Sequence, residues 1–412
     1  MDNLLKHIVL SVFALTVVAS LTACGGGSSS TPTAIPNTLS VYYAHSLVFR
    51  NSTTLAAGYN GSGQLGTGNL GNQSVPVAVS GGLFCKGAAA GGDHSVAVFN
   101  NASSTVRSWG DNRVGQLGNG TTTYSSVPVR TINLNNVTAV AAGGLHTVAL
   151  KSDGTVWSWG DNTASQLGVP ANTTNSLGTN ISTLGYSTVP VQVTVDGTPL
   201  SNITAIAANG RHSLALDSFG QVWAWGYNGA GQLGLDPTMT GALATPRVVA
   251  GFPAPIVAIA AGGAFNYALT ATGEVYAWGN NGNGQLGNGT TTNSFAPVKV
   301  MMTGNVPLTN VKQVAAGIQH GLALLDSGSV VALGYNIYGQ LGTNSKLDSS
   351  VAVPVLDETG TTPLTGVTEI RAFGSSSMAR KGSTWYVWGD NTFGQLGMGG
   401  TGTLLLPAKS LF

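Results

Sequence analysis

Three glycine-rich segments have the spacing of a nucleotide-binding loop. Gly282-Asn-Gly284-Gln-Leu-Gly287 matches G-x-G-x-x-G, and residues 61–66 and 229–234 match it as well. In dinucleotide-binding folds this fingerprint follows a strand and opens a helix whose N-terminus holds the pyrophosphate. Here Asn-Gly-Thr-Thr-Thr-Asn comes next, which is a poor helix, and no acidic residue ends a second strand about 20 residues further on. We therefore predict tight turns and no cofactor.

The histidines are the next residues that could do chemistry. Five of the six share one position of an internal repeat, with Phe265 and Ser377 in two further copies. Zinc ligands must all lie within about 2.1 Å of one ion, whereas equivalent positions of different repeats are held apart. We predict buried hydrogen bonds and no metal site. The five histidines are His45, His94, His146, His212 and His320.

Acid–base catalysis would need a pair of carboxylates. Asp111, Asp161 and Asp390 share one repeat position, but tyrosine or asparagine occupies it in the other copies. This variation favours a loop-stabilising role. The chain also contains no G-x-S-x-G, H-E-x-x-H, EF-hand loop or P-loop lysine. We predict a protein that is not an enzyme.

The charge of the chain restricts its partners. Charged residues make up only 8% of the sequence and the net charge is +1, with no cluster of lysine and arginine. Proteins that hold nucleic acid need a concentrated basic surface for the phosphates. We therefore expect no nucleic-acid partner.

A repeat of about 50 residues organises the sequence. Gly-Gln-Leu-Gly or a near copy occurs seven times, and Gly-x-Asn stands upstream of each copy, preceded by tryptophan in five. A Pro-Val segment follows, then Ala-Ala-Gly-x-x-His. The seven copies begin at Gly63, Gly115, Ser165, Gly231, Gly284, Gly339 and Gly394.

Four short apolar or alternating runs in each repeat predict strands. They lie around Pro-Val, before Ala-Ala-Gly, at His-x-Leu-Ala-Leu and before Trp-Gly. A four-stranded unit repeated seven times predicts an all-β, seven-bladed β-propeller. Residues 37–60 and 405–412 each hold part of a unit, so we expect the N- and C-terminal strands to share one blade and close the ring. Gly-Gln-Leu-Gly is expected to cross from one blade to the next.

The combined pattern resembles the regulator-of-chromosome-condensation repeat family over residues 37–412. The resemblance implies a seven-bladed β-propeller. The eukaryotic namesake of the family is a nucleotide-exchange factor on chromatin, whereas secreted bacterial members, including a β-lactamase-inhibitor protein, bind other proteins through the loops of one propeller face. The resemblance therefore favours a binding module over an enzyme.

The N-terminus has the layout of an export signal. Residues 1–23 contain a short apolar stretch, too short to span a bilayer, followed by small residues. Leu21-Thr22-Ala23-Cys24 resembles the bacterial lipobox, which implies lipid on Cys24; Gly25 after it implies the outer membrane. Residues 24–36 form a Gly/Ser/Thr/Pro tether. We expect a monomeric propeller that reaches the membrane through this lipid alone.

Function should lie where the repeat varies. The variable positions of Ala-Ala-Gly-x-x-His and of Gly-x-Asn-x-x-Gly are expected on one face, and a long insertion through residues 169–188 joins them. We predict that a protein binds there, with a glycan as an alternative partner. A carbohydrate-active or lyase-type envelope enzyme, or a purely structural envelope protein, remains an alternative function. The candidate residues are Asp93, Arg113, Tyr186, Arg211, Tyr338 and Phe393.

Overall fold

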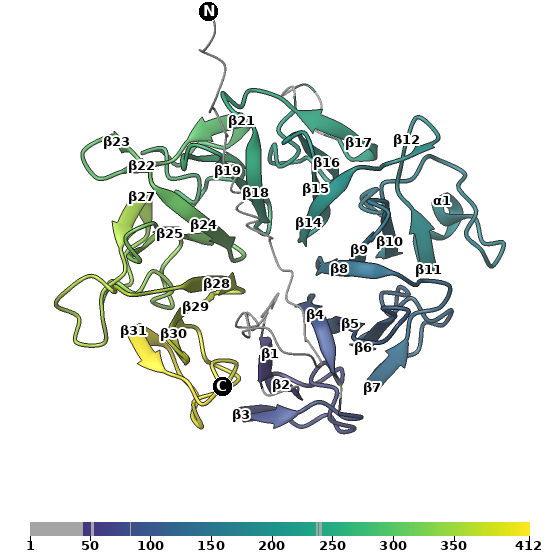
Figure 1. Ribbon diagram of the computed structural model, residues 1–412, viewed down its shortest axis with the longest axis horizontal. Coiled ribbons are helices and arrows are strands. Elements are labelled where there is room, and N and C mark those ends of the chain that lie inside the picture. Colours follow the sequence, from purple (N-terminus) through teal and green to yellow (C-terminus); the bar gives the residue numbers. More distant parts are fainter. Residues whose placement is uncertain (1–43, 51–52, 83, 236–237, 239–240) are drawn as a thin grey trace, which may run out of the picture.

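Seven twisted β-sheets stand around a central axis in the computed structural model (Figure 1). The structure describes residues 44–412 except 51–52, 83, 236–237 and 239–240. We number the sheets as blades 1 to 7 in chain order. The predicted all-β, seven-bladed propeller is confirmed.

The innermost strand of each blade ends in the Ala-Ala-Gly segment. Neighbouring inner strands contact one another around the axis. For blade 1, any residue before 44 lies outside the described part of the chain. The inner strands of blades 2 to 7 are β4 (Cys85–Ala90), β8 (Val137–Ala142), β14 (Ile203–Asn209), β18 (Ile256–Ala261), β24 (Val311–Ala316) and β28 (Glu369–Phe373).

The second strand of each blade starts at the histidine position of the repeat. The register of blade 7 puts Ser376 there, opposite Gly389, as His94 lies opposite Gly110. The assignment of Ser377 to this position is therefore wrong by one residue. The second strands are β1 (His45–Arg50), β5 (His94–Phe99), β9 (His146–Lys151), β15 (His212–Asp217), β19 (Phe265–Thr270), β25 (His320–Leu325) and β29 (Ser376–Lys381).

The third strand of each blade ends at the glycine of Gly-x-Asn. Valine, tryptophan and other bulky residues occupy both of its faces, which suits a strand that is buried on both faces. The third strands are β2 (Thr53–Gly58), β6 (Val106–Gly110), β10 (Val156–Asp161), β16 (Val222–Gly226), β20 (Val275–Gly279), β26 (Val330–Gly334) and β30 (Thr384–Gly389).

The outer strand of each blade is the Pro-Val segment. It pairs with the third strand just before it in the chain. Gly-Gln-Leu-Gly therefore turns within a blade, and the prediction that it crosses between blades is wrong. The outer strands are β3 (Gln73–Ala78), β7 (Ser125–Arg130), β11 (Tyr186–Gln192), β17 (Leu243–Val249), β21 (Ser294–Lys299), β27 (Ser349–Pro354) and β31 (Leu404–Lys409).

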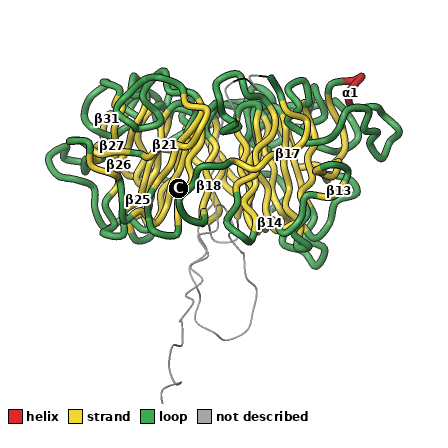
Figure 2. The backbone as a smooth tube through the Cα atoms, turned by 90° about the horizontal axis from the view of Figure 1, so that it is seen from above, coloured by secondary structure: helices red, strands yellow, loops and turns green. Residues whose placement is uncertain are grey.

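Short elements decorate this frame. One helical turn, α1 (Ile181–Leu184), lies in the insertion of blade 3 at the upper face in Figure 2. Two small hairpins precede blades 4 and 6 in the chain. They consist of β12 (Thr194–Val195) with β13 (Thr198–Pro199), and of β22 (Met301–Met302) with β23 (Val306–Pro307).

The ring closes differently from the sequence-based expectation. Strand β31 pairs with β30 of its own blade and not with the N-terminal strands. Instead, the Gly399 N–H donates to the Ser74 carbonyl of β3 at 2.8 Å, as the Gly68 N–H donates to Ser126 at 2.9 Å between blades 1 and 2. Blade 7 therefore meets blade 1 through the contact that joins other neighbouring blades, so no blade is shared.

The core lies between adjacent blades. The tryptophan of β6, Trp109, is fully buried and its Nε1–H donates to the Gln64 carbonyl of blade 1 at 2.8 Å. The equivalent bond exists at Trp159, Trp225, Trp278 and Trp388. The predicted packing role of these tryptophans is confirmed, and their indole N–H groups also bind the preceding blade.

The histidines join the blades from inside the core. His45 Nε2 lies 2.9 Å from the Ser95 hydroxyl of blade 2, and that hydroxyl donates to the Gln64 carbonyl at 2.8 Å. Burial lowers the pKa of His45 to about 3 and that of His94 to about 4, so both are neutral. Equivalent bonds occur at His94 and at the other three histidines. The predicted hydrogen-bonding role is confirmed.

Candidate functional site

Two sets of loops form one face of the propeller. We call the turn between inner and second strands the inner loop, and the connection between third and outer strands, with Gly-Gln-Leu-Gly, the outer loop. The Asp111 N–H donates to the Asp93 carbonyl at 2.8 Å, and the Tyr227 N–H to the Arg211 carbonyl at 2.9 Å. The equivalent bond is present in all seven blades. The predicted convergence of these loops on one face is confirmed.

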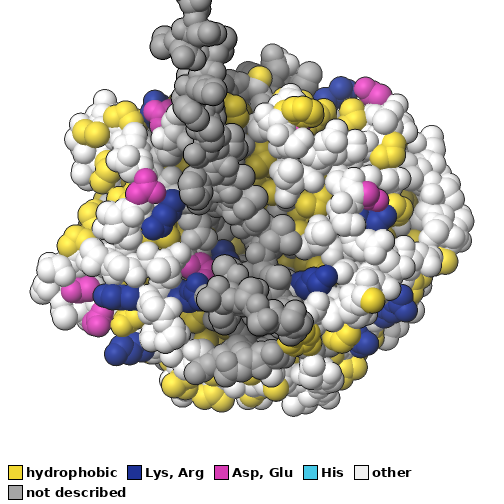
Figure 3. All heavy atoms as spheres, viewed as in Figure 1, with side chains coloured by type: hydrophobic (Ala, Val, Ile, Leu, Met, Phe, Trp, Pro, Cys, Tyr) yellow, Lys and Arg dark blue, Asp and Glu magenta, His cyan; other side chains and the backbone are white. Residues whose placement is uncertain are grey.

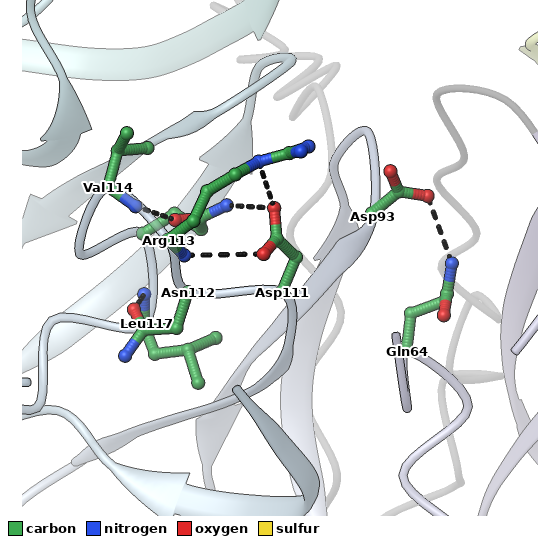
Figure 4. Close-up of polar contacts among 8 residues, drawn as sticks. Gln64, Asp93, Asp111, Asn112, Arg113, Val114 and Leu117 are labelled. Carbon is green, nitrogen blue, oxygen red and sulfur yellow. Dashed lines mark hydrogen bonds and ion pairs between the residues drawn. The ribbon is translucent and has the colours of Figure 1, made fainter. Parts of the chain in front are cut away.

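Each outer loop is held by its own Asn and Gln. Asn112 Oδ1 accepts the Leu117 N–H at 2.9 Å, and Gln116 Oε1 accepts the Val114 N–H at 3.1 Å. Gln116 Nε2 donates to Asp111 at 2.8 Å (Figure 4 shows this loop). All seven loops have the Asn-to-Leu bond. The repeated residues thus form a rigid frame, on which the variable side chains are presented.

A pocket of about 440 Å³ opens in this face over blades 2 to 4. It brings together three of the six predicted residues, Asp93, Arg113 and Arg211. Gly92, Gly144 and Gly210 of three neighbouring inner loops also line it. Hydrogen bonds join these loops, because the Gly92 N–H donates to the Gly144 carbonyl at 3.0 Å and the Gly144 N–H donates to the Gly210 carbonyl at 2.8 Å. We call it the blade 2–4 pocket.

The two arginines of the pocket are held by different contacts. Arg113 Nε forms a 2.9 Å ion pair with Asp111, while 64% of its side chain is exposed. One terminal nitrogen of Arg211 donates to the Thr163 hydroxyl at 2.8 Å, and the guanidinium lies 5.7 Å from the Tyr227 ring centroid. Neither guanidinium is buried, so both reach solvent in the pocket.

Asp93 lies beside these arginines on the inner loop of blade 2. Its carboxylate accepts a 3.0 Å hydrogen bond from Gln64 Nε2 (Figure 4). Burial and then the negative charge of Asp111 raise the pKa of Asp93 above 3.8, while Arg113 partly offsets them. The negative charge of Asp93 is therefore less favoured than that of a carboxylate in solvent.

Two polar side chains of the lining, Asp161 and Thr163, were not among the predicted binding residues. Asp161 accepts Thr163 N–H and hydroxyl bonds at 3.0 Å each, and a Gln166 bond at 2.6 Å. This confirms the loop-stabilising role that the repeat predicts for its aspartates. Thr163 occupies the position that Arg113 has in blade 2, so alignment of the repeats could have identified it.

The aromatic candidates are not part of the pocket lining. Tyr338, 38% exposed, contacts Tyr335 edge-on at 6.4 Å between ring centroids. Phe393, 39% exposed, contacts Tyr59 at 5.1 Å across the seam of blades 7 and 1. Tyr186 begins β11 opposite Asp161 and is half-buried. The structure therefore separates Tyr338 and Phe393 from the charged candidates, whereas Tyr186 lies opposite Asp161 of the pocket lining.

A smaller hollow lies between blades 5 and 6. Its volume is about 230 Å³, and Asn280, Gln285 and Gln319 line it. Gln285 Nε2 already donates to Asn280 at 2.7 Å. This neutral site occupies the same place in the repeat as the blade 2–4 pocket, but without its charges.

The blade 2–4 pocket offers a ligand hydrogen-bond donors on its two guanidinium groups. Asp111 and Asp161 both accept side-chain hydrogen bonds within their own loops, and the histidines of the described strands are buried between blades. In the residues that the structure describes, no group of three or more His, Cys, Asp or Glu side chains could hold a metal. Guanidinium groups on rigid loops can instead bind an anionic group of a partner.

The opposite face carries charged side chains of both signs. Figure 3 shows lysine and arginine side chains scattered among acidic and neutral ones on the side seen in Figure 1. Among the described residues, no helix has the length and apolar character of a membrane span.

Sequence comparison identifies the repeat. The RCC1-like domain matches residues 171–411, and the regulator of chromosome condensation (RCC1) repeat matches residues 54–98, 105–150 and 137–166. The mitochondrial RCC1 domain-containing protein RUG3 of Arabidopsis thaliana is 31% identical over 344 residues, which cover 80% of this chain and 68% of RUG3.

Two further relatives match over less of their length. The ultraviolet-B receptor UVR8 of Arabidopsis thaliana is 30% identical over 75% of this chain and 66% of UVR8. The human probable E3 ubiquitin-protein ligase HERC3 is 33% identical over 50% of this chain. The chain spans about two thirds of the two plant proteins and 19% of HERC3.

Solved structures show the same fold. Human WBSCR16 superposes with a TM-score of 0.70 at 24% identity, over 86% of this chain and 93% of that structure. Prp20p from Saccharomyces cerevisiae gives a TM-score of 0.69 at 23% identity, over 90% and 87%.

Proposed function

This chain belongs to the regulator of chromosome condensation (RCC1) family, and we propose that it acts without catalysis by binding a protein through its inner and outer loops. One observation carries the proposal: Asp93 and Arg113 of blade 2 and Arg211 of blade 4 line one pocket, on loops that their own backbone bonds hold rigid. Rigid presentation lowers the entropic cost of association, and arginine is enriched where proteins bind one another.

The family supports a protein partner. Yeast RCC1 (Prp20) has been solved with Kap60 bound to it, and Prp20p has been studied for its binding to Gsp1p and histones. For this chain we propose a different partner from the same class of molecule, because the sequence predicts export. The exposed Tyr338 and Phe393 supply apolar contacts at a distance from the charged pocket.

We further propose that the propeller is a lipoprotein of a bacterial envelope, held at the outer membrane. The support is the sequence of residues 1–36, with the lipobox-like segment that ends at Cys24 and the tether after it. These residues lie outside the described part of the chain.

The anchor is tested with the Cys24→Ser variant of the full chain. Wild type should partition into the detergent phase, and its N-terminal peptide should carry the mass of a diacylglycerol on Cys24. The variant should stay in the aqueous phase. An unmodified Cys24 in the wild-type protein would contradict the lipoprotein proposal.

Binding is tested by capture from envelope extract with three immobilised proteins. These are wild type, a variant with Arg113, Arg211, Tyr338 and Phe393 changed to alanine, and a control with exposed Arg130 and Arg247 of the outer strands changed to alanine. The loop variant should lose protein partners that wild type and control retain. Identical recovery by all three would show that the loop face is not the binding face.

A further inference from the structure

The blade 2–4 pocket has unused hydrogen-bond donors on its cations. Arg113 uses its Nε for Asp111, and Arg211 uses one terminal nitrogen for Thr163. A guanidinium carries five N–H groups. Each arginine therefore keeps donors for a ligand, and both belong to the lining of the same pocket.

Two of the three carboxylates at the pocket already accept most of the hydrogen bonds that they can. The Asp161 carboxylate accepts three hydrogen bonds and is 6% exposed. The Asp111 carboxylate accepts from Gln116 Nε2 and the Arg113 N–H, and forms the ion pair with the Arg113 guanidinium. Asp93 is left with one bond, from Gln64. Asp111 and Asp161 therefore leave few lone pairs for a cationic ligand, and Asp93 is the carboxylate that keeps free acceptors, whereas an anionic ligand would find free donors on both arginines.

The positions of the two guanidiniums are constrained before a ligand arrives. Arg211 contacts both Thr163 and the Tyr227 ring, and Asp111 holds Arg113 at its Nε. In Figure 4 the terminal nitrogens of Arg113 extend beyond Asp111, toward the side where Asp93 lies. Such prior ordering reduces the side-chain entropy lost on binding.

We propose that the blade 2–4 pocket receives an acidic side chain, Asp or Glu, from the protein partner, with Arg113 and Arg211 as its donors. This deepens the proposed function and rests on it. Carboxylates suit guanidinium groups because their two oxygens accept parallel N–H bonds. The 440 Å³ volume admits a side chain and part of its backbone, and Leu145 in the lining offers an apolar contact for its methylene groups.

Arginine side-chain NMR tests the inference on the full chain. The sequence has eight arginines, so the Nε–Hε spectrum is sparse and can be assigned with single substitutions. The probe is the peptide acetyl-Gly-Glu-Gly-amide, with acetyl-Gly-Gln-Gly-amide as the uncharged control of equal shape. Arg113 and Arg211 should shift with the glutamate peptide alone, while Arg247 on the outer strand β17 should not.

Variants give the second arm of the test. Arg113→Ala with Arg211→Ala should weaken the glutamate peptide at least about tenfold, since charge-assisted bonds are lost. Asp93→Asn should strengthen it, because a nearby negative charge is removed. Unchanged thermal unfolding of each variant would show that the fold is intact.

The outcomes separate this inference from the proposed function. Equal shifts with both peptides, or equal shifts of all arginines, would overturn the acidic-ligand assignment. If envelope capture still depends on the loop face in that case, the proposed function stands without it. If capture does not depend on the loop face, both fail.

Discussion

The ring of Phe412 packs over Gly397, where an added Cβ would lie 2.7 Å from the ring. At the interface of blades 1 and 2 the equivalent Gly66 is covered by Trp109. The third strand of blade 1 has Ala57 at the tryptophan position, and alanine is too small to fill this space. Phe412 therefore replaces the missing tryptophan where blade 7 meets blade 1.

Removal of this ring should weaken the closed propeller. We expect Phe412→Ala to lower the free energy of unfolding by about 3 kcal/mol, because an almost fully buried aromatic side chain is lost and a cavity remains. Urea denaturation followed by tryptophan fluorescence measures the change. Leu411→Ala, at a side chain that is 56% exposed, is the matched control. Equal effects of the two substitutions would show that Phe412 does not close the ring.

The buried histidines predict acid sensitivity. Burial lowers the pKa of His146 to about 3 and that of His212 to about 4, from an ordinary value of 6.5. The unfolded chain therefore binds more protons than the folded chain below pH 6.5, so stability is full above that pH and declines as the pH falls toward the folded pKa values. Each such histidine contributes about 1.4 kcal/mol per pH unit.

Unfolding free energies at pH 7, 6 and 5 measure this decline. His146→Phe should reduce the slope of stability against pH by the share of one histidine. The fold should accept this substitution, since Phe265 occupies the equivalent position in blade 5. An unchanged slope in the variant would contradict the assignment. Above pH 7 we expect no contribution from these groups.

Tyr267 compensates for an irregular repeat. Blade 6 has Leu333 where five other blades have tryptophan, so the Gln285 carbonyl lacks an indole donor, and Tyr267 of blade 5 donates its hydroxyl there at 2.6 Å. Tyr267→Phe should cost about 1–3 kcal/mol, the usual penalty for a buried carbonyl left unsatisfied. Chemical denaturation measures it. Tyr276→Phe is the control, because Tyr276 lies beside surface Lys299; a similar loss in both would refute the compensating role.

The pKa of Asp93 reports the electrostatics of the blade 2–4 pocket. Carboxyl ¹³C shifts should place it above 3.8. Asp111→Asn should lower it, since a repulsive negative charge is removed, and Arg113→Ala should raise it, since an attractive positive charge is removed. A value at or below 3.8 in wild type, or shifts of the opposite sign, would contradict this description of the pocket.

Local interactions were predictable because they repeat. The Asn112 and Gln116 bonds connect residues within five positions of each other. Every copy of the repeat therefore contains the residues that stabilise its own outer loop. The common face of inner and outer loops followed from strand order alone. Three of the six proposed binding residues meet in one pocket, whereas their role in binding stays a prediction.

Other features depended on contacts between repeats. Outer strand β31 has the same composition whether it pairs with β30 or with an N-terminal strand, and periodicity does not distinguish the two arrangements. The histidine position of blade 7 was assigned to Ser377 instead of Ser376, because blade 7 lacks a histidine that would mark the register. Thr163 was overlooked because its partner Arg211 is 48 residues away in the chain.

The sequence alone determined the repeat, the four-stranded all-β unit, the number of blades and the face that carries the variable loops. The hydrogen bonds and apolar alternation behind these features act within about 50 residues and recur seven times. Only the tertiary structure decided how the ring closes, with Phe412 over Gly397, and which variable residues share a pocket. Both depend on the angle and distance between neighbouring blades, which result from packing of side chains far apart in the chain.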